Sequence, residues 1–259
     1  MIMALVATIF ASCGDDATST GNDNLGRQLL GKWMDAEHDG QPVVTNEKWV
    51  LTFTSDTSAI VSTSRADFTA EQEMWDAYRE CDVTIDGNNI VLSYNPNKTV
   101  RVVLEYDVKS VTSSELVAHS KQTIYLNDEI LAARAVDVRY EKVNREYRED
   151  ILGVWEGRVT SDGSDYDDGE PHRWVYKADG SYEYYDQVDG QWQLHGNDFN
   201  EYFVDGVLLC TRWRDPGSDE LREWWEIASI ANGRMDWTSL RRKDDGTSYT
   251  ATFSMTKVQ

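Results

Sequence analysis

Cysteine, proline and basic residues are scarce in this chain, and each scarcity excludes a class of protein. Three cysteines in 259 residues are too few for a disulfide scaffold. Four prolines leave long stretches free to form uninterrupted strands. Lysine and arginine number 25 against 46 aspartates and glutamates, so the formal net charge is -21. Binding to a nucleic-acid backbone requires basic side chains that displace counterions, so we expect no nucleic-acid partner.

The chain also lacks the sequence signatures of catalysis and cofactor binding. It contains no G-x-S-x-G, no phosphate-binding loop and no dinucleotide-binding glycine pattern. The four histidines are scattered, and no pair has the spacing of metal ligands on a helix. The acidic run at 161–170 offers oxygen atoms suited to Ca²⁺, but it matches no complete calcium-loop pattern and favours a solvated loop. We therefore expect no enzymatic activity, no cofactor and no bound metal.

The amino-terminal segment has the features of an export signal. Residues 1–10 are apolar and uncharged, and they are too few to span a bilayer as a helix. The run ends in Ala11-Ser12-Cys13, which resembles the lipobox of bacterial lipoproteins. The resemblance implies that residues 1–13 form a signal peptide ending at a lipidated Cys13. It also implies an outer-membrane lipoprotein of the cell envelope, attached to the membrane only by this lipid. The alternative is a buried first strand with a cysteine in the core.

Beyond the cysteine, the chain divides into a polar tether and two similar halves. Residues 14–24 contain no large apolar side chain, so we expect a flexible tether over residues 14–27. Four short runs then occur twice in the same order, which predicts one domain over residues 28–144 and a second over residues 145–259. The paired runs are 30–33 with 152–155, 53–58 with 176–181, 83–90 with 192–199, and 141–143 with 255–258.

Each half is expected to be all-β. Apolar and polar residues alternate with period two in runs such as 49–53 and 102–106. Asp86-Gly87, Asn232-Gly233 and Asp245-Gly246 supply the positive φ angles that tight hairpins need. Short strands joined by such hairpins are typical of antiparallel barrels and sandwiches.

Two local features add to this pattern. One short helix is predicted inside the first half, over residues 67–80, because Thr69 and Gln72 have the spacing of a capping box. Cys81 and Cys210 lie on apolar stretches, one in each half, and we expect a buried thiol at each position. The alternative is a disulfide between the two halves, whose geometry sequence alone does not define.

The most specific resemblance lies in the first repeated run. Gly31-Lys32-Trp33 and Gly153-Val154-Trp155 both match G-x-W, the first motif of the lipocalins. The resemblance implies two tandem antiparallel lipocalin-like β-barrels, each closed at one end by its tryptophan. It also implies an arginine beside that tryptophan, for which Arg139, Arg241 and Arg242 are the candidates. The second lipocalin motif, T-D-Y, is absent from both halves, so the resemblance is distant and carries no ligand class.

Aromatic residues are concentrated in the second half, which holds 7 of the 10 tryptophans. This excess predicts an aromatic pocket with arginine near it to hold a polar group. The alternative is that bulky side chains fill a small barrel. Trp224 and Trp225 are adjacent, so on a strand they face opposite sides. The candidate ligand-binding residues are Trp174, Tyr176, Tyr184, Trp192, Arg212, Trp213, Arg214 and Trp224.

These observations favour a binding protein over an enzyme. We expect a small apolar or amphipathic ligand, held by aromatic side chains in the second barrel. The alternative is a protein whose barrels are filled and whose surface binds another envelope protein or a glycan. The volume of the barrel interior separates the two, because a void of several hundred Å³ is the size of a small-molecule site.

Overall fold

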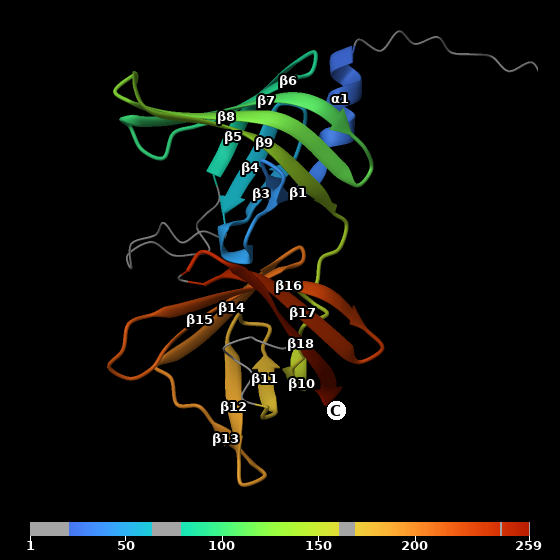
Figure 1. Cartoon of the computed structure of the whole chain (residues 1–259), viewed down its shortest axis with the longest axis vertical. Helices are drawn as coiled ribbons and strands as arrows, with labels where there is room; N and C mark the ends of the chain where they lie inside the picture. The colour runs from blue at the N-terminus through green and yellow to red at the C-terminus, as the bar shows by residue number, and fades with distance from the viewer. Residues whose placement is uncertain (1–20, 64–78, 161–168, 244, 259) are drawn as a thin grey trace, which may run out of the picture.

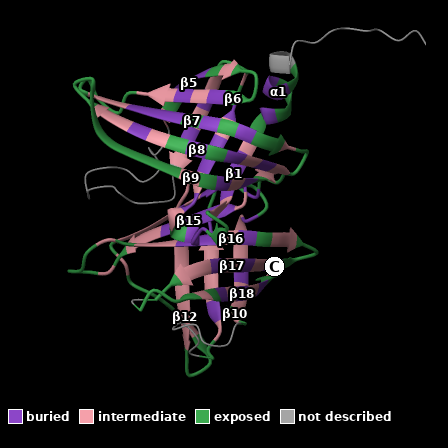
Figure 2. Ribbon diagram, turned by 45° about the horizontal axis from the view of Figure 1, so that its top comes forward, coloured by how far each residue is buried: buried purple, intermediate pink, exposed green. Residues whose placement is uncertain are grey.

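The alternating runs form strands along most of the chain, as their period-two pattern predicts. A computed structural model describes residues 21–63, 79–160, 169–243 and 245–258. These residues form two antiparallel β-sheets, one from each half, stacked along the long axis of the molecule (Figure 1). Buried and exposed residues alternate along many of the strands (Figure 2). The all-β prediction is confirmed.

The first half folds into a closed barrel. Eight strands, β1 and β3 to β9, follow one another around it, and pairing between β1 and β9 closes it. The short strand β2 pairs with the end of β1, and the 3-10 turn η1 (Thr45–Glu47) follows it. The strands are β1 (Gly31–His38), β2 (Gln41–Pro42), β3 (Trp49–Phe53), β4 (Ser58–Thr63), β5 (Arg79–Asp86), β6 (Asn89–Tyr94), β7 (Val100–Val111), β8 (Glu115–Leu126) and β9 (Glu129–Val143).

The second half forms a curled nine-stranded sheet. Pairing runs in the order β13-β12-β11-β10-β18-β17-β16-β15-β14, so β13 and β14 are its edges. The curl brings β14 to the start of β12, since an isolated bridge joins Ser181 to Glu201 and the Tyr202 N–H donates to the Gly180 carbonyl at 2.8 Å. The strands are β10 (Gly153–Val159), β11 (His172–Tyr176), β12 (Tyr182–Val188), β13 (Gln191–Leu194), β14 (Phe199–Asp205), β15 (Leu208–Arg214), β16 (Leu221–Ala231), β17 (Arg234–Arg242) and β18 (Ser248–Val258).

The third repeated run accounts for this difference between the halves. In the first half, residues 83–90 form the hairpin that pairs β5 with β6 through the turn at Gly87, whose φ is 59°. In the second half, residues 192–199 connect β13 to β14, and these two described strands do not pair. We call this interruption between the β12–β13 hairpin and β14 the seam. The sequence similarity of this run therefore does not extend to its pairing.

Each sheet is plugged at one end by the tryptophan of its G-x-W run, as predicted. Trp33 and Trp155 are fully buried. The Trp33 indole N–H donates to the Leu29 carbonyl at 2.6 Å, and the Trp155 indole N–H donates to the Ile151 carbonyl at 2.6 Å. Both indoles are therefore buried with their polar atom satisfied, which marks them as structural plugs rather than ligand contacts.

Lysine, not arginine, accompanies each plug tryptophan. Lys142 and Lys257 are the direct cross-strand partners of the plugs, with Nζ 4.1 Å and 5.1 Å from the respective ring centroids. The predicted arginines have other roles. Arg139 bonds Glu141 of its own strand and Glu37 of β1, Arg241 bonds a glutamate on β16, and Arg242 faces a glutamate of η1. Strand register places the lysines, not these arginines, directly opposite the plug tryptophans.

One expectation about the first half is corrected near its amino terminus, and a second lies mostly outside the described residues. The helix α1 (Gly21–Leu29) covers the plugged end of the barrel, where Leu25 and Leu29 are buried in its core. The flexible tether expected up to residue 27 is therefore wrong for its last residues, because a single buried leucine anchors them. The helix predicted over residues 67–80 lies outside the described residues up to 78, and Arg79 and Glu80 begin strand β5 instead.

An apolar cluster joins the two halves. Met34 and Val50 from the outer face of the first barrel pack with Leu208, Cys210 and Trp224 from the outer face of the second sheet, and all five are buried. We call this set the interface cluster. It lies between the two apolar cores. It also places Trp224, the outward-facing residue of the adjacent tryptophan pair, between the halves.

Polar contacts surround the interface cluster. The Thr45 hydroxyl donates to Glu226 at 3.0 Å and accepts the Leu240 N–H at 2.9 Å. Lys48 lies 3.4 Å from the same glutamate. The two described cysteines are both buried as thiols, Cys81 in the first core and Cys210 in the interface cluster, so the disulfide alternative does not hold.

Candidate ligand cavity in the second sheet

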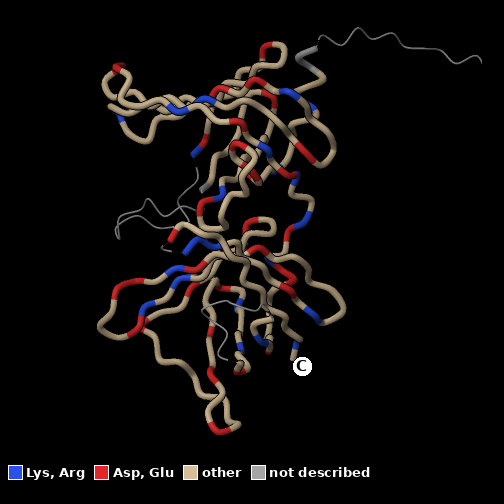
Figure 3. Tube along the Cα trace, in the orientation of Figure 1, with Lys and Arg blue, Asp and Glu red and all other residues tan. Residues whose placement is uncertain are grey.

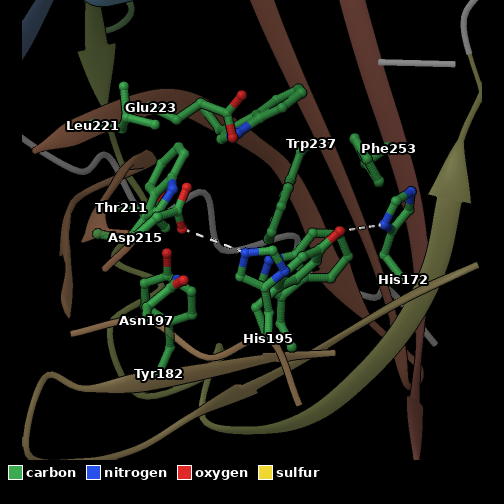
Figure 4. Close-up of a pocket in the computed structure, with 14 residues that line it drawn as sticks. His172, Tyr182, His195, Asn197, Thr211, Asp215, Leu221, Glu223, Trp237 and Phe253 are labelled. Atoms are coloured by element: carbon green, nitrogen blue, oxygen red, sulfur yellow. Dashed lines mark hydrogen bonds and ion pairs between the residues drawn. The ribbon is translucent and has the colours of Figure 1, made fainter. Parts of the chain in front are cut away.

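A cavity of about 480 Å³ lies inside the curled second sheet. Strands β11, β12, β15, β16, β17 and β18 supply most of its lining, and the connection across the seam and Asp215 after β15 supply the rest (Figure 4). The lining residues are His172, Trp174, Tyr182, Tyr184, His195, Asn197, Thr211, Trp213, Asp215, Leu221, Glu223, Trp225, Trp237 and Phe253.

Strand alternation selects these side chains. Residues two apart on a strand share a face, so Thr211 and Trp213 of β15 both line the cavity. Arg212 and Arg214, on the same strand, face outward. On β16, Trp225 faces the cavity, and the adjacent Trp224 belongs to the interface cluster.

The closed end of the cavity is a cluster of aromatic rings. The ring centroid of Trp174 lies 5.3 Å from that of Trp237 and 5.4 Å from that of Phe253, both nearly edge-to-face. Trp225 lies 5.6 Å from Trp237 and 5.4 Å from Phe253. Three of these four pairs are edge-to-face, an arrangement that aromatic rings favour.

His195 stands at the seam between two carboxylates. Its Nδ1 lies 3.0 Å from Asp186 and its Nε2 lies 3.4 Å from Asp215, the latter marked in Figure 4. The hydrogen bond to Asp186 is the main reason that the pKa of His195 lies above its ordinary value, with Asp215 adding to the effect. The imidazole is about 43% exposed, so this group lies at the open end of the cavity.

His172 lies on the opposite side of the cavity and is buried. Its Nδ1 and the Tyr184 hydroxyl are 2.6 Å apart, and the two rings stack with centroids 5.9 Å apart (Figure 4). His172 lies on strand β11 and His195 follows strand β13, and the ring of Tyr184 contacts both imidazoles.

Glu223 is the second carboxylate of the lining. Its Oε1 accepts a hydrogen bond of 2.7 Å from Arg241, whose guanidinium lies 4.4 Å from the ring centroid of Trp225. This glutamate is therefore charge-compensated by a cross-strand neighbour.

Trp237 and Asn197 of the lining each have a polar atom with no hydrogen-bond partner among the described residues. One is the indole N–H of Trp237, a side chain that is only 2% exposed. The other is Oδ1 of Asn197, whose amide group donates to Asn200 at 2.6 Å. Buried polar atoms are normally paired, so these two atoms mark where a bound molecule can form hydrogen bonds.

Three of the eight predicted ligand-binding residues line the cavity, namely Trp174, Tyr184 and Trp213. Tyr176 lies in the core beyond the lining, where its ring packs 4.8 Å from that of Tyr202 and 6.2 Å from that of Trp237. The prediction that aromatic residues of the second half gather around one space therefore agrees with the arrangement of these side chains.

The other four predicted residues lie elsewhere. Arg212 bonds Glu201 and Arg214 bonds Asp198 on the outer face of the sheet. Trp192 stacks outside under the Arg173 guanidinium, 4.4 Å from its ring centroid. Trp224 is in the interface cluster. These four are corrections to the expected site, and all follow from which face of its strand each residue occupies.

Sequence reasoning missed most of the polar lining. His195, Asn197 and Asp215 follow strand ends, where period-two alternation gives no direction. Thr211 and Glu223 are detectable from the sequence, since each is two residues from a lining tryptophan and residues two apart on a strand share a face.

The first barrel contains a much smaller space. Its cavity measures about 160 Å³ and is lined by polar and apolar side chains near one end. Asp35 is fully buried there, accepts the Trp49 N–H at 2.5 Å and lies 3.2 Å from His38 Nε2. Burial raises the pKa of this carboxyl group.

The chain matches no model of a known protein family and no curated protein sequence. None of the helices in the described ranges has the length and hydrophobicity that a membrane span needs. Within those same ranges, no three side chains of histidine, cysteine, aspartate or glutamate are grouped to hold a metal ion.

Proposed function

We propose that the chain is an envelope-anchored, lipocalin-like lipoprotein that binds a small apolar or amphipathic ligand in its second sheet, without catalysing a reaction. The observation that carries this proposal is the aromatic cavity of about 480 Å³. Ligand sites of roughly 300–1,000 Å³, mostly apolar with a few directed polar groups, are the usual size for small molecules.

Two further features support binding at this place. The seam lies beside the cavity, and His195 and Asn197 of the seam belong to its lining, which provides an entrance. The unpartnered N–H of Trp237 and oxygen of Asn197 supply the few polar groups that orient a ligand.

The binding proposal is tested with N-phenyl-1-naphthylamine, a neutral apolar fluorophore, and the full chain. We expect energy transfer from the cavity tryptophans to the bound probe. Trp213→Ala removes one ring of the lining and should weaken binding several-fold, equivalent to about 1 kcal/mol. Trp192→Ala is the matched control, because it deletes the same ring from the outer face.

The outcomes separate the two functions. Equal effects of the two substitutions would place the probe outside the cavity. If neither this probe nor a panel of lipids and oligosaccharides binds, the ligand-binding function is wrong. A surface interaction would then take its place, and Ile130 and Leu131, 65% and 63% exposed on β9, are the first residues to substitute.

The lipoprotein part of the proposal rests on the apolar run that ends in Ala11-Ser12-Cys13. Cys13→Ala should release the protein from the membrane fraction, because the lipid is its proposed attachment. Metabolic labelling with a tagged fatty acid should mark the wild type and not the variant. Identical fractionation of the two proteins would contradict the anchor without affecting the cavity experiment.

A further inference from the structure

The charges around the cavity are unequally distributed. Acidic and basic side chains are interspersed along both sheets (Figure 3). Among the described residues that line the cavity, however, two are carboxylates, Asp215 and Glu223, and none is lysine or arginine. The arginines of β15 lie on the other face of the sheet, bonded to Glu201 and Asp198.

The two ends of the cavity differ in polarity. At the closed end, Trp225 and Trp237 are each 2% exposed. At the open end, Leu221 is 46% exposed, and the side chain of Asp215 is 39% exposed. A molecule that fills this space therefore places an apolar part among indole rings and its other end beside a carboxylate.

The carboxylate at the open end is only partly compensated. Asp215 shares His195 with Asp186, so two carboxylates surround one imidazole. Even when the imidazole is protonated, this group of three has a net negative charge. Glu223 differs, because Arg241 donates to it at 2.7 Å and neutralises it.

The neutral groups that line the cavity also favour a positively charged ligand. Asn197 presents an acceptor oxygen with no partner among the described residues. Trp174 and Trp213 line the same space, and aromatic rings attract a cation over their faces. A hydrogen-bond donor with a positive charge satisfies all of these groups together.

We propose that the cavity selects a cationic amphiphile, an organic amine whose ammonium group lies between Asp215 and Asn197 and whose apolar body lies among Trp174, Trp225 and Trp237. This inference rests on the proposed ligand-binding function and specifies its ligand class. An anionic amphiphile such as a fatty acid would meet carboxylates at the open end with no arginine or lysine in the described lining to balance its charge.

Three probes with one phenylbutyl body test the selectivity. They are 4-phenylbutylammonium, 4-phenylbutanol and 4-phenylbutyrate, which carry a cationic, a neutral and an anionic head. Dissociation constants are measured by calorimetry and tryptophan quenching at 150 mM salt, where the Debye length of about 8 Å screens the distant charges of the chain. We expect the cation to bind about 5- to 30-fold more tightly than the anion, from the cation–π and carboxylate contacts together.

Asp215→Asn tests whether the selectivity arises at this site. The substitution keeps the shape and a hydrogen-bonding group but removes the charge, so the preference for the cation over the anion should fall, and the affinity for the alcohol should change less than that for the cation. Asp137→Asn is the matched control, since it removes the same charge from a carboxylate paired with His119, at 2.7 Å, on the first barrel. Thermal melting checks that both variants are folded.

The results distinguish this inference from the proposed function. If all three probes bind with similar affinity, or the anion binds most tightly, the cavity binds ligands but does not select cations. If Asp137→Asn lowers the preference as much as Asp215→Asn, the selectivity reflects overall charge and the inference is wrong. If none of the three probes binds, the proposed function itself fails.

Discussion

The two halves of the molecule share a plan and differ in what occupies the interior. In both, a G-x-W tryptophan plugs one end, and a lysine from the closing strand lies over it. Strand register then aligns three small or aliphatic residues of the first barrel with three aromatic residues of the second sheet. The aligned pairs are Leu51 with Trp174, Ala59 with Tyr182 and Val61 with Tyr184.

The half with the smaller side chains at these positions encloses the smaller cavity. The space inside the first barrel measures about 160 Å³. The aromatic residues of the second sheet surround a space of about 480 Å³. An aromatic excess therefore indicates a cavity here, not a filled interior.

Closure of the sheet is the second difference. The β5–β6 hairpin completes the first barrel, whereas the corresponding run of the second half crosses the seam without pairing β13 to β14. His195 and Asn197 lie in that crossing and line the cavity. Because β13 and β14 do not pair, this crossing provides an entrance to the cavity and places polar groups beside that entrance.

The largest predicted effect tests what the halves share. Trp33→Ala and Trp155→Ala each remove a fully buried plug, so each should lower the free energy of unfolding by about 3–5 kcal/mol in urea denaturation. Only Trp155→Ala should also weaken binding of the apolar probe. A Trp33→Ala protein as stable as the wild type would show that the two plugs are not equivalent.

A smaller effect is expected where the halves differ in the closing pair of strands. Gly157 occupies the position that Asp35 holds in the first half, four residues after the G-x-W glycine. A Cβ at Gly157 would lie 2.2 Å from the Ser254 carbonyl oxygen, so Gly157→Ala should destabilise the second sheet by about 1–3 kcal/mol. Gly196→Ala is the control, because a Cβ there meets no atom within 4 Å. Equal melting temperatures of the two variants would contradict the close approach of β10 and β18.

The smallest effect concerns the pH dependence of the second sheet. His195 has a folded-state pKa raised above 6.5, chiefly by Asp186. Its contribution to stability is therefore complete below the unfolded-state value of 6.5 and is lost as the pH rises through the higher folded-state value. Because the group is about 43% exposed, solvent screening limits the contribution to roughly 0.2–1 kcal/mol. Urea denaturation of His195→Gln and of the wild type across this pH range measures the contribution of His195 to stability. If the two free energies of unfolding change in parallel with pH, the ion pairs of His195 contribute nothing.

Much of the fold could be predicted from the sequence. The duplicated G-x-W run predicted two similar β units and two structural tryptophans, and Asn232-Gly233 predicted the hairpin between β16 and β17. These predictions hold because a turn, a strand face and a buried indole each depend on residues close in sequence. The anchoring of α1 was missed, since Leu25 is an isolated apolar residue whose partner strands lie far along the chain.

The candidate site also has features that depend on nearby residues and features that depend on distant strands. The sequence by itself determined that Trp224 and Trp225 face opposite ways, because alternation is a property of one strand. Only the tertiary structure decided which of the two lies inside, since that depends on the curl of the sheet and on the first barrel covering Trp224. Pairing between distant strands also produces the seam, the position of His195 and Asp215 beside it, and the outward position of Arg212. Such pairing depends on residues far apart in the chain, so local sequence patterns do not predict it.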